Sequence, residues 1–313
     1  MASISTINVG DLQTNGLLNA SILAEAKVRM LLADSTTLRN TAAIQQIGNV
    51  AGRGSKVLNV RYAGLGSNLS MDAASSEVSA ESVSSVDVSN ATVTIARRYL
   101  GLDESQLAQI AGAGWGFDPM VLAGTMVDSF EKGFMGLLGT AIQSFGTDVG
   151  NASGTASVDD AYDVIETMES EGASGSAIFT MLHPTQIGEV RSEIRSEVGP
   201  GGFRTDAQEM LAYKGAGYVG SYLGLHFFST ANVVDATSKY HGAAWVPGAI
   251  GYGIGSTERV ITNSGVLRPA GIPVVIELEP VPGSGKVTIH SNAYDGLGII
   301  EDARGVGWVT SSV

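Results

Sequence analysis

Apolar positions spaced by three and four predict one long helix between residues 118 and 145. Asp118 suits the N-cap, Pro119 suits the first helical position and Gly146 can end the helix. The apolar positions are Leu122, Met126, Val127, Phe130, Phe134, Leu137, Leu138, Ile142 and Phe145. About 27 helical residues would extend over about 40 Å.

Four glycines interrupt this predicted helix, namely Gly124, Gly133, Gly136 and Gly139. Each costs up to about 1 kcal/mol relative to Ala in a helix interior. Two explanations stay open. Another element packs closely against a glycine stripe, which we favour, or the helix is built to bend between two states.

An alternation of polar and β-branched residues predicts two strands earlier in the chain, at Lys56–Tyr62 and Val86–Arg97. The stretch between them, Ser67 to Ser85, is rich in Ser and carries three carboxylates. Together they predict an extended hairpin with a polar tip. Because a lone hairpin is marginally stable and has open edges, we expect neighbouring copies to support it. The alternative is a disordered Ser-rich linker, against which the recurring valines argue.

The rest of the chain mixes helices and strands without regular alternation, which favours an α+β fold. Ser157 and Asp160 form a capping-box pattern before a helix at Val158–Ser170. A second helix is expected from Pro184 to about Ser196. Strands are expected at Ala177–Leu182, Leu223–Phe228, Ala243–Val246, Val274–Leu278 and Lys286–His290, with short β pieces at Gly298–Ile300 and Gly307–Val309. Residues 1–54 read as an arm with little core of its own.

Composition excludes several classes of protein. The chain has 313 residues and no Cys, so disulfides, thiol catalysis and cysteine metal sites are absent. Its 18 Lys and Arg oppose 31 Asp and Glu, a net charge of −13, and no cation cluster occurs beyond Arg97 and Arg98. A sequence-independent nucleic-acid binder needs such clusters. This net negative charge is compatible with a container wall that encloses DNA without adhering to it. No signal peptide or membrane-length apolar run is found, so no membrane partner is expected.

Two glycine-rich strings resemble nucleotide-binding motifs, but neither has the required context. Gly215–Gly220 matches the dinucleotide pattern, yet a helical run precedes it and a β-type run follows, the reverse of what pyrophosphate binding needs. Gly283–Lys286 lacks the first Gly and the final Ser or Thr of a phosphate loop and reads as a hairpin turn. We therefore expect no cofactor and no cofactor-binding residues.

Catalytic and metal-binding residues are likewise not expected. The histidines show no two-His helical spacing and no carboxylate motif beside them, and no nucleophile elbow occurs. The four are His183, His226, His241 and His290. The acidic pair Asp159–Asp160 is explained by the first turn of a helix. The sequence indicates a protein that is not an enzyme.

The order of these segments resembles the major capsid protein of tailed bacteriophages, which has the Hong Kong 97-type fold. Four strings carry the resemblance over nearly the whole chain. Val93–Leu100 looks like the strand leaving the extended loop, Asp118–Phe145 like the spine helix, Ile178–Pro184 like the apical strand entering a helix, and Gly220–Phe228 like the strand returning to the shell. The terminal Gly-rich β segment resembles the return through the peripheral domain.

The resemblance implies a division of the chain into five segments. They are an N-terminal arm at 1–54, an extended hairpin loop at 55–98, a peripheral domain with the spine helix at 99–156, an apical domain at 157–272, and a return β segment of the peripheral domain at 273–313.

It also implies a function. The chain would assemble as pentamers and hexamers into an icosahedral shell around double-stranded DNA, with portal, separate scaffolding and decoration proteins as further partners. The protein would reside in the virion after assembly in the host cytoplasm. Two alternatives are an encapsulin-type nanocompartment shell protein, which has a similar fold, and an exported surface adhesin, which would need an export signal.

Overall fold

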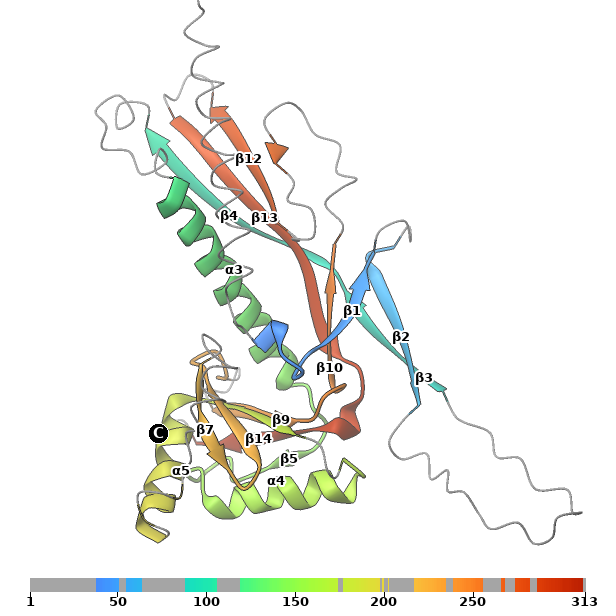
Figure 1. The fold of residues 1–313 in the computed structure, drawn as a ribbon, viewed down its shortest axis with the longest axis vertical. Helices are drawn as coiled ribbons and strands as arrows, with labels where there is room; N and C mark the ends of the chain where they lie inside the picture. The colour runs from blue at the N-terminus through green and yellow to red at the C-terminus, as the bar shows by residue number, and fades with distance from the viewer. Residues whose placement is uncertain are drawn as a thin grey trace, which may run out of the picture.

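In the computed structural model, the described residues form two large sheets, a small two-stranded sheet and three α-helices. The α+β molecule is elongated, with a long sheet above and a lobe below (Figure 1). The structure describes residues 38–50, 55–63, 88–105, 119–173, 177–197, 199, 202, 217–234, 239–255, 266–267, 274–281 and 286–311. The arm before residue 38 and the Ser67–Ser85 stretch lie outside them.

Helix α3, Pro119–Ile142, lies along one side of the long sheet and reaches the lobe (Figure 1). The predicted helix is confirmed, but it ends at Ile142 rather than at Phe145. A turn follows, in which Ser144 N donates to Ala141 O, and Gly146 N donates to Asp302 Oδ1 at 2.9 Å. The chain leaves the helix early because this segment is bonded to the lobe. Phe145 is nevertheless buried.

The long sheet is organised around one strand of 14 residues, β13. Its strands are β1 (Gln45–Asn49), β10 (Ile250–Ile254), β13 (Lys286–Ile299), β12 (Val274–Val281) and β11 (Val266–Leu267), in that order, with β4 (Ala96–Ser105) on the other edge of β13. The sequence prediction was wrong in ending the strand at His290 and opening another at Gly298. The stretch between holds the polar residues Ser291, Asn292 and Asp295 and one glycine, Gly296, and pairing with β4 and β10 keeps it extended.

Strand β1 was not predicted either, and neither was the preceding short helix η1, Leu38–Asn40. Leu38, Ala43 and Ile44 are buried in the main core, which also holds Phe134 and Leu138 of α3. Residues 38–50 therefore belong to the body of the molecule, because β1 pairs in parallel with β10.

The second sheet lies between two layers of helix. Its strands are β5 (Asp148–Val149), β14 (Gly305–Thr310), β9 (Tyr240–Trp245), β6 (Ile178–Leu182), β8 (Leu225–Ser229) and β7 (Tyr218–Tyr222), and η3 (Asp302–Arg304) precedes β14. Side chains alternate across the sheet. Phe179 and Met181 of β6 join the core that includes α3, while Ile178 and Leu182 join the core with α4 and α5.

Helices α4 (Val158–Ser170) and α5 (Pro184–Glu197) confirm their sequence predictions. The capping box is formed. Ser157 Oγ accepts from Asp160 N at 3.2 Å, and Asp160 Oδ2 accepts from Ser157 N at 2.8 Å. Strand β6 is also as predicted.

The expected strand Leu223–Phe228 is confirmed from Leu225 on, as β8, but its first two residues form a turn. The longer strand Gly220–Phe228 is wrong, because the chain reverses within it. Leu223 has φ 53° and Gly224 has φ 85°. Two successive residues at positive φ form the tight turn of a two-residue hairpin, which joins antiparallel β7 and β8.

A third, two-stranded sheet projects from the long one. Strand β2, Val57–Ala63, pairs antiparallel with β3, Val88–Thr94. The predicted strand Val86–Arg97 is split at Ile95, because β3 belongs to this hairpin whereas β4 pairs with β13. The expected return segment 273–313 spans both larger sheets, with β12 and β13 in the first and β14 in the second. The five-segment division stays a prediction.

Candidate assembly surfaces

The four histidines have different surroundings. His183 stacks on Tyr240 with ring centroids 4.0 Å apart, and burial lowers the pKa of His183. His241 Nε2 lies 3.3 Å from Asp148 Oδ1, His290 of β13 pairs with Gly101 of β4, and His226 lies in β8. Among the described residues no group of three His, Asp or Glu side chains could hold a metal. No described helix is both long and apolar enough to span a membrane.

The described residues of the two glycine-rich strings lie next to or within β-strands. Gly217 has φ 77° and is followed directly by strand β7, so no helix N-terminus follows the string. Val281 of β12 pairs with Lys286 of β13, which places 282–285 at the end of an antiparallel pair. The expectation that the chain has no catalytic or cofactor-binding residues stays a prediction.

The hairpin β2–β3 is anchored at its root and open toward its tip. Leu58, Val93 and Ile95 are buried at the root against Ile47, Val50 and Tyr294. Farther out on the same face Val60 and Tyr62 are only half-buried. Val88 pairs with Ala63 and lies on the opposite face, where it is 56% exposed. Neither β2 nor β3 pairs with any other described strand. This projecting face, which we call the hairpin face, offers open backbone edges and apolar side chains to another chain.

An ion pair at the start of β4 ties this region to α3 and β13. The Arg98 guanidinium donates through Nε to Asp295 Oδ1 at 2.8 Å and through Nη2 to Asp295 Oδ2. Tyr252 Oη also donates to Asp295 Oδ2, at 3.1 Å. The Asp295 side chain is fully buried, so these donors compensate its charge. Burial and, after it, the Asp295 charge raise the pKa of Tyr252, which keeps the phenol protonated as a donor.

A second arginine approaches the same place from η1. The guanidinium carbons of Arg39 and Arg98 lie 4.9 Å and 5.2 Å from the centroid of the Phe130 ring. Arg39 also pairs with Glu131 at 3.0 Å. Phe130 of α3 therefore contacts two cations that come from η1 and β4, an arrangement that stabilises their approach. We call Arg98, Asp295, Tyr252, Arg39 and Phe130 the arginine clamp.

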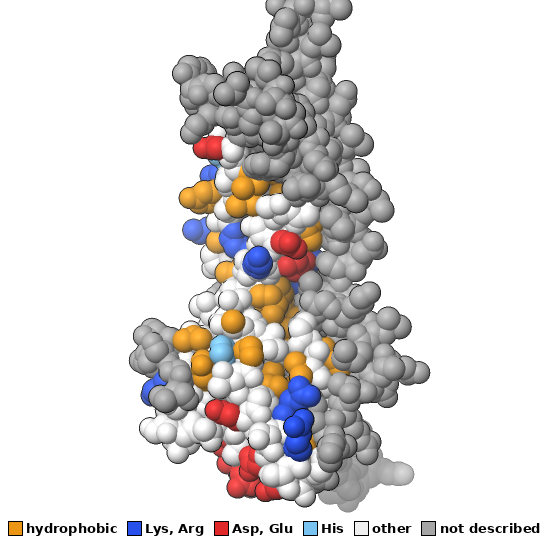
Figure 2. All heavy atoms as spheres, turned by 90° about the vertical axis from the view of Figure 1, so that its left-hand side faces the viewer, with side chains coloured by type: hydrophobic (Ala, Val, Ile, Leu, Met, Phe, Trp, Pro, Cys, Tyr) orange, Lys and Arg blue, Asp and Glu red, His pale blue; other side chains and the backbone are white. Residues whose placement is uncertain are grey.

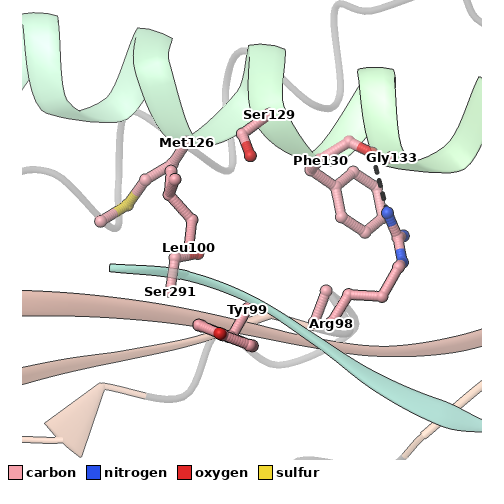
Figure 3. Close-up of a pocket in the computed structure, with 9 residues that line it drawn as sticks. Arg98, Tyr99, Leu100, Met126, Ser129, Phe130, Gly133 and Ser291 are labelled. Carbon is pink, nitrogen blue, oxygen red and sulfur yellow. Dashed lines mark hydrogen bonds between the residues drawn. The ribbon is translucent and has the colours of Figure 1, made fainter. Parts of the chain in front are cut away.

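A groove of about 160 Å³ opens beside the clamp, between α3 and the strands β4 and β13 (Figure 3). Arg98 reaches from β4 toward the helix, where its Nη1 lies 3.4 Å from the Phe130 carbonyl oxygen. Leu100 and Met126 supply apolar lining. The alternation of β4 places Tyr99 on the opposite face from Arg98, and Tyr99 is 75% exposed. An exposed aromatic side chain of this kind is typical of a surface that a partner covers.

The glycines of α3 divide between two environments. A Cβ at Gly133 would overlap the Arg98 guanidinium, and one at Gly139 would overlap the backbone carbonyl of Asn232. A Cβ at Gly124 or Gly136 would have no described atom within 4 Å. Close packing, the explanation we favoured, accounts for Gly133 and Gly139 and leaves the other two unexplained.

These environments predict opposite effects of the same substitution. Gly136→Ala should raise the free energy of unfolding by up to about 1 kcal/mol, because Ala favours the helix and meets nothing. Gly139→Ala should lower it by about 1–3 kcal/mol, because backbone must shift. Denaturant unfolding of both variants measures the two effects. If Gly139→Ala also stabilised the protein, packing would not be the reason for that glycine.

Comparisons with known proteins place the fold. No family model matches the chain, and no curated protein matches it. Several solved structures are similar to the chain. The head of Helicobacter pylori bacteriophage KHP40 is similar with a TM-score of 0.58 at 11% identity, covering 85% of this chain and 86% of that one. The capsid of cyanophage P-SCSP1u is similar with a TM-score of 0.56 at 12% sequence identity, covering 87% of this chain and 88% of that one.

An encapsulin, a shell protein of another kind, has a structure similar to this chain as well. The holo-SrpI encapsulin complex from Synechococcus elongatus PCC 7942 gives a TM-score of 0.53 at 12% identity, covering 73% of this chain and 78% of that one. At such identities the likeness concerns the fold. The chain therefore has the α+β fold of phage capsid structures, as the resemblance implied.

Proposed function

We propose that this chain is a structural subunit that assembles with copies of itself into a closed icosahedral shell around double-stranded DNA. The observation that carries the proposal is the hairpin face, which is buried at its root and only half-buried farther out. Such a hairpin is marginally stable alone, and a neighbouring copy would supply the missing contacts.

The similar structures support this role. They include the capsids named above and the capsid of a native GTA particle, which the chain resembles with a TM-score of 0.56 at 11% identity over 88% of its length. In this proposal pentamers and hexamers form the shell, the protein resides in the virion, and it performs no catalysis. Portal, scaffolding and decoration proteins would be its partners. A net charge of −13 suits a wall that does not adhere to DNA.

An encapsulin-type nanocompartment is the second candidate, because the SrpI encapsulin is also similar. The contents of purified particles separate the two. Nuclease-protected double-stranded DNA supports the capsid, and an enclosed protein cargo without DNA supports the nanocompartment.

Replacing Ser67–Ser85 by a short Gly-Ser turn tests the role of the hairpin. The lobe should keep its fold, because the core residues that the structure describes in it come from other segments, among them α4, α5, β6 and β8. Closed particles should be lost, because the tip would no longer reach a neighbour. Negative-stain imaging and sizing report assembly, and thermal unfolding reports the lobe. Normal shells from the shortened chain would refute the role of the loop.

A further inference from the structure

Helix α5 carries opposite charges on its two edges. Glu189 Oε2 accepts from Ala156 N, and Glu193 Oε2 accepts from Val158 N, both at 2.8 Å. These carboxylates thus point to the start of α4. Arg191 and Arg195 are four residues apart and exposed. Residues two positions apart on a helix point about 200° apart, and Arg191 and Arg195 each follow one of these glutamates by two positions. The two arginines therefore lie on the edge that faces away from α4. We call this the basic edge.

Helix α4 presents only negative charge outward. Asp159, Asp163, Glu166 and Glu169 are exposed, whereas Val158, Ala161, Val164 and Met168 are buried. The helix contains no Lys or Arg. Its outward side, together with Glu197 at the end of α5, is the acidic face. It lies across α5 from the basic edge.

An apolar group lies next to the acidic face. Tyr162 of α4 is 52% exposed and Leu223, at the β7–β8 turn, is 41% exposed. Tyr222, the residue before this turn, packs against the core to which α4 and α5 both contribute. Burial and, after it, the charge and hydrogen bond of Tyr162 raise the pKa of Tyr222. Leu223 has φ 53°, an unfavourable conformation for a bulky residue. Strained residues and exposed tyrosines both gather at interaction sites.

We propose that the lobes of two copies dock head to tail, the basic edge of one copy against the acidic face and the Tyr162–Leu223 group of the next. This inference rests on the proposed function and adds the surface through which copies form rings. A contact between two different patches repeats around a rotation axis and closes a ring. Two identical acidic faces would repel each other in a chain of net charge −13. Gly188 is exposed one turn from Arg191, a Cβ there would have no described atom within 4 Å, and its lack of a side chain allows close approach.

The surface view agrees with this separation of charge. Figure 2 looks onto the side of the molecule on which α5 lies in Figure 1. Basic side chains gather in the lower part of this face, and acidic side chains gather toward its lower end (Figure 2). The two groups are distinct, as a head-to-tail contact requires.

Charge reversal on each side tests the contact. Arg191→Glu with Arg195→Glu, or Asp163→Arg with Glu166→Arg, should raise the concentration needed for assembly by about a hundredfold, because like charges then meet. All four positions are exposed, so far-UV circular dichroism and thermal unfolding should stay unchanged. The chain carrying all four substitutions should assemble again, since its contacts pair opposite charges. This combined variant also restores the net charge.

Mixing the two single-sided variants adds a test of polarity. A copy with a reversed basic edge (Arg191→Glu with Arg195→Glu) carries only negative charge on its two docking patches. A copy with a reversed acidic face (Asp163→Arg with Glu166→Arg) carries only positive charge on them, so the two kinds of copy must alternate around a ring. Rings with an even number of copies can alternate, and pentamers cannot. The mixture should therefore give hexamers, sheets or tubes in negative stain but no closed shells. The combined variant should give closed shells.

The inference and the proposed function can fail separately. If the unmodified chain forms shells and the single-sided variants form them equally well, the docking surface is wrong while the shell role stands. The docking surface is also wrong if the variant with all four substitutions assembles no better than the two single-sided variants. If the unmodified chain forms neither shells nor rings at any concentration, the proposed function is wrong, and the docking inference is wrong with it.

Discussion

Replacing Arg98 with Ala is expected to lower the free energy of unfolding by about 3–5 kcal/mol, because it leaves a buried carboxylate without its cation. Asp295 is 0% exposed and accepts two bonds from Arg98. Tyr252 alone would remain to donate to it. The loss should appear as a lower denaturant midpoint, measured at a concentration where the chain does not assemble.

The neighbouring arginine is the matched control. Arg97 is exposed and donates to Asn292 Oδ1 at 2.8 Å, so Arg97→Ala should cost only about 1 kcal/mol. Equal losses from the two variants would contradict the arginine clamp as the feature that holds β4 to β13 and α3.

Gly296→Val is expected to destabilise the chain by about 3 kcal/mol and to release the hairpin root. A Cβ at Gly296 would overlap Thr94 O and lie 2.8 Å from the Thr94 carbonyl carbon. Backbone lies on both sides of this contact, so it can be relieved only by moving β3 away from β13. Hydrogen exchange should then become faster in β2 and β3.

Gly298 of the same strand provides the comparison. A Cβ there would meet the flexible Val93 Cγ2 first, at 3.3 Å, so Gly298→Ala should cost about 1 kcal/mol or less. If Gly296→Val left exchange in the hairpin unchanged, close backbone approach would not be what anchors it.

Elements with strong local signals were predictable from the sequence. Helix α4 has a capping box and a clear apolar stripe, and its bounds are as predicted. Helix α5 begins at its proline, and β6 is a short apolar run before it. In each case the residues that decide the structure are neighbours in the chain.

The junction between β3 and β4 could not be predicted in the same way. Its residues keep a strand-like alternation through Ile95, so no local signal marks the place where the chain changes sheets. The change is imposed by β13, whose Gly296 lies against Thr94 and Ile95. The turn at Leu223 was missed for a related reason, since leucine is an unusual residue at positive φ.

The candidate surfaces were foreseen only in part. The exposed hairpin follows from the alternating pattern and its lack of large side chains. The arginine clamp was missed. Arg97 and Arg98 were noticed only as adjacent cations, whereas strand alternation sends them to opposite faces, and the partner Asp295 is 197 residues away. A buried charge pair at such separation leaves no local pattern.

The most direct test of a subunit that depends on its copies is the size of the purified chain as a function of concentration. Analytical ultracentrifugation with negative-stain imaging should find rings or closed shells above a threshold concentration. Below that threshold, hydrogen exchange should be fast in the outer part of β2 and β3. A monomer at every concentration, with the hairpin fully protected from exchange, would contradict the account.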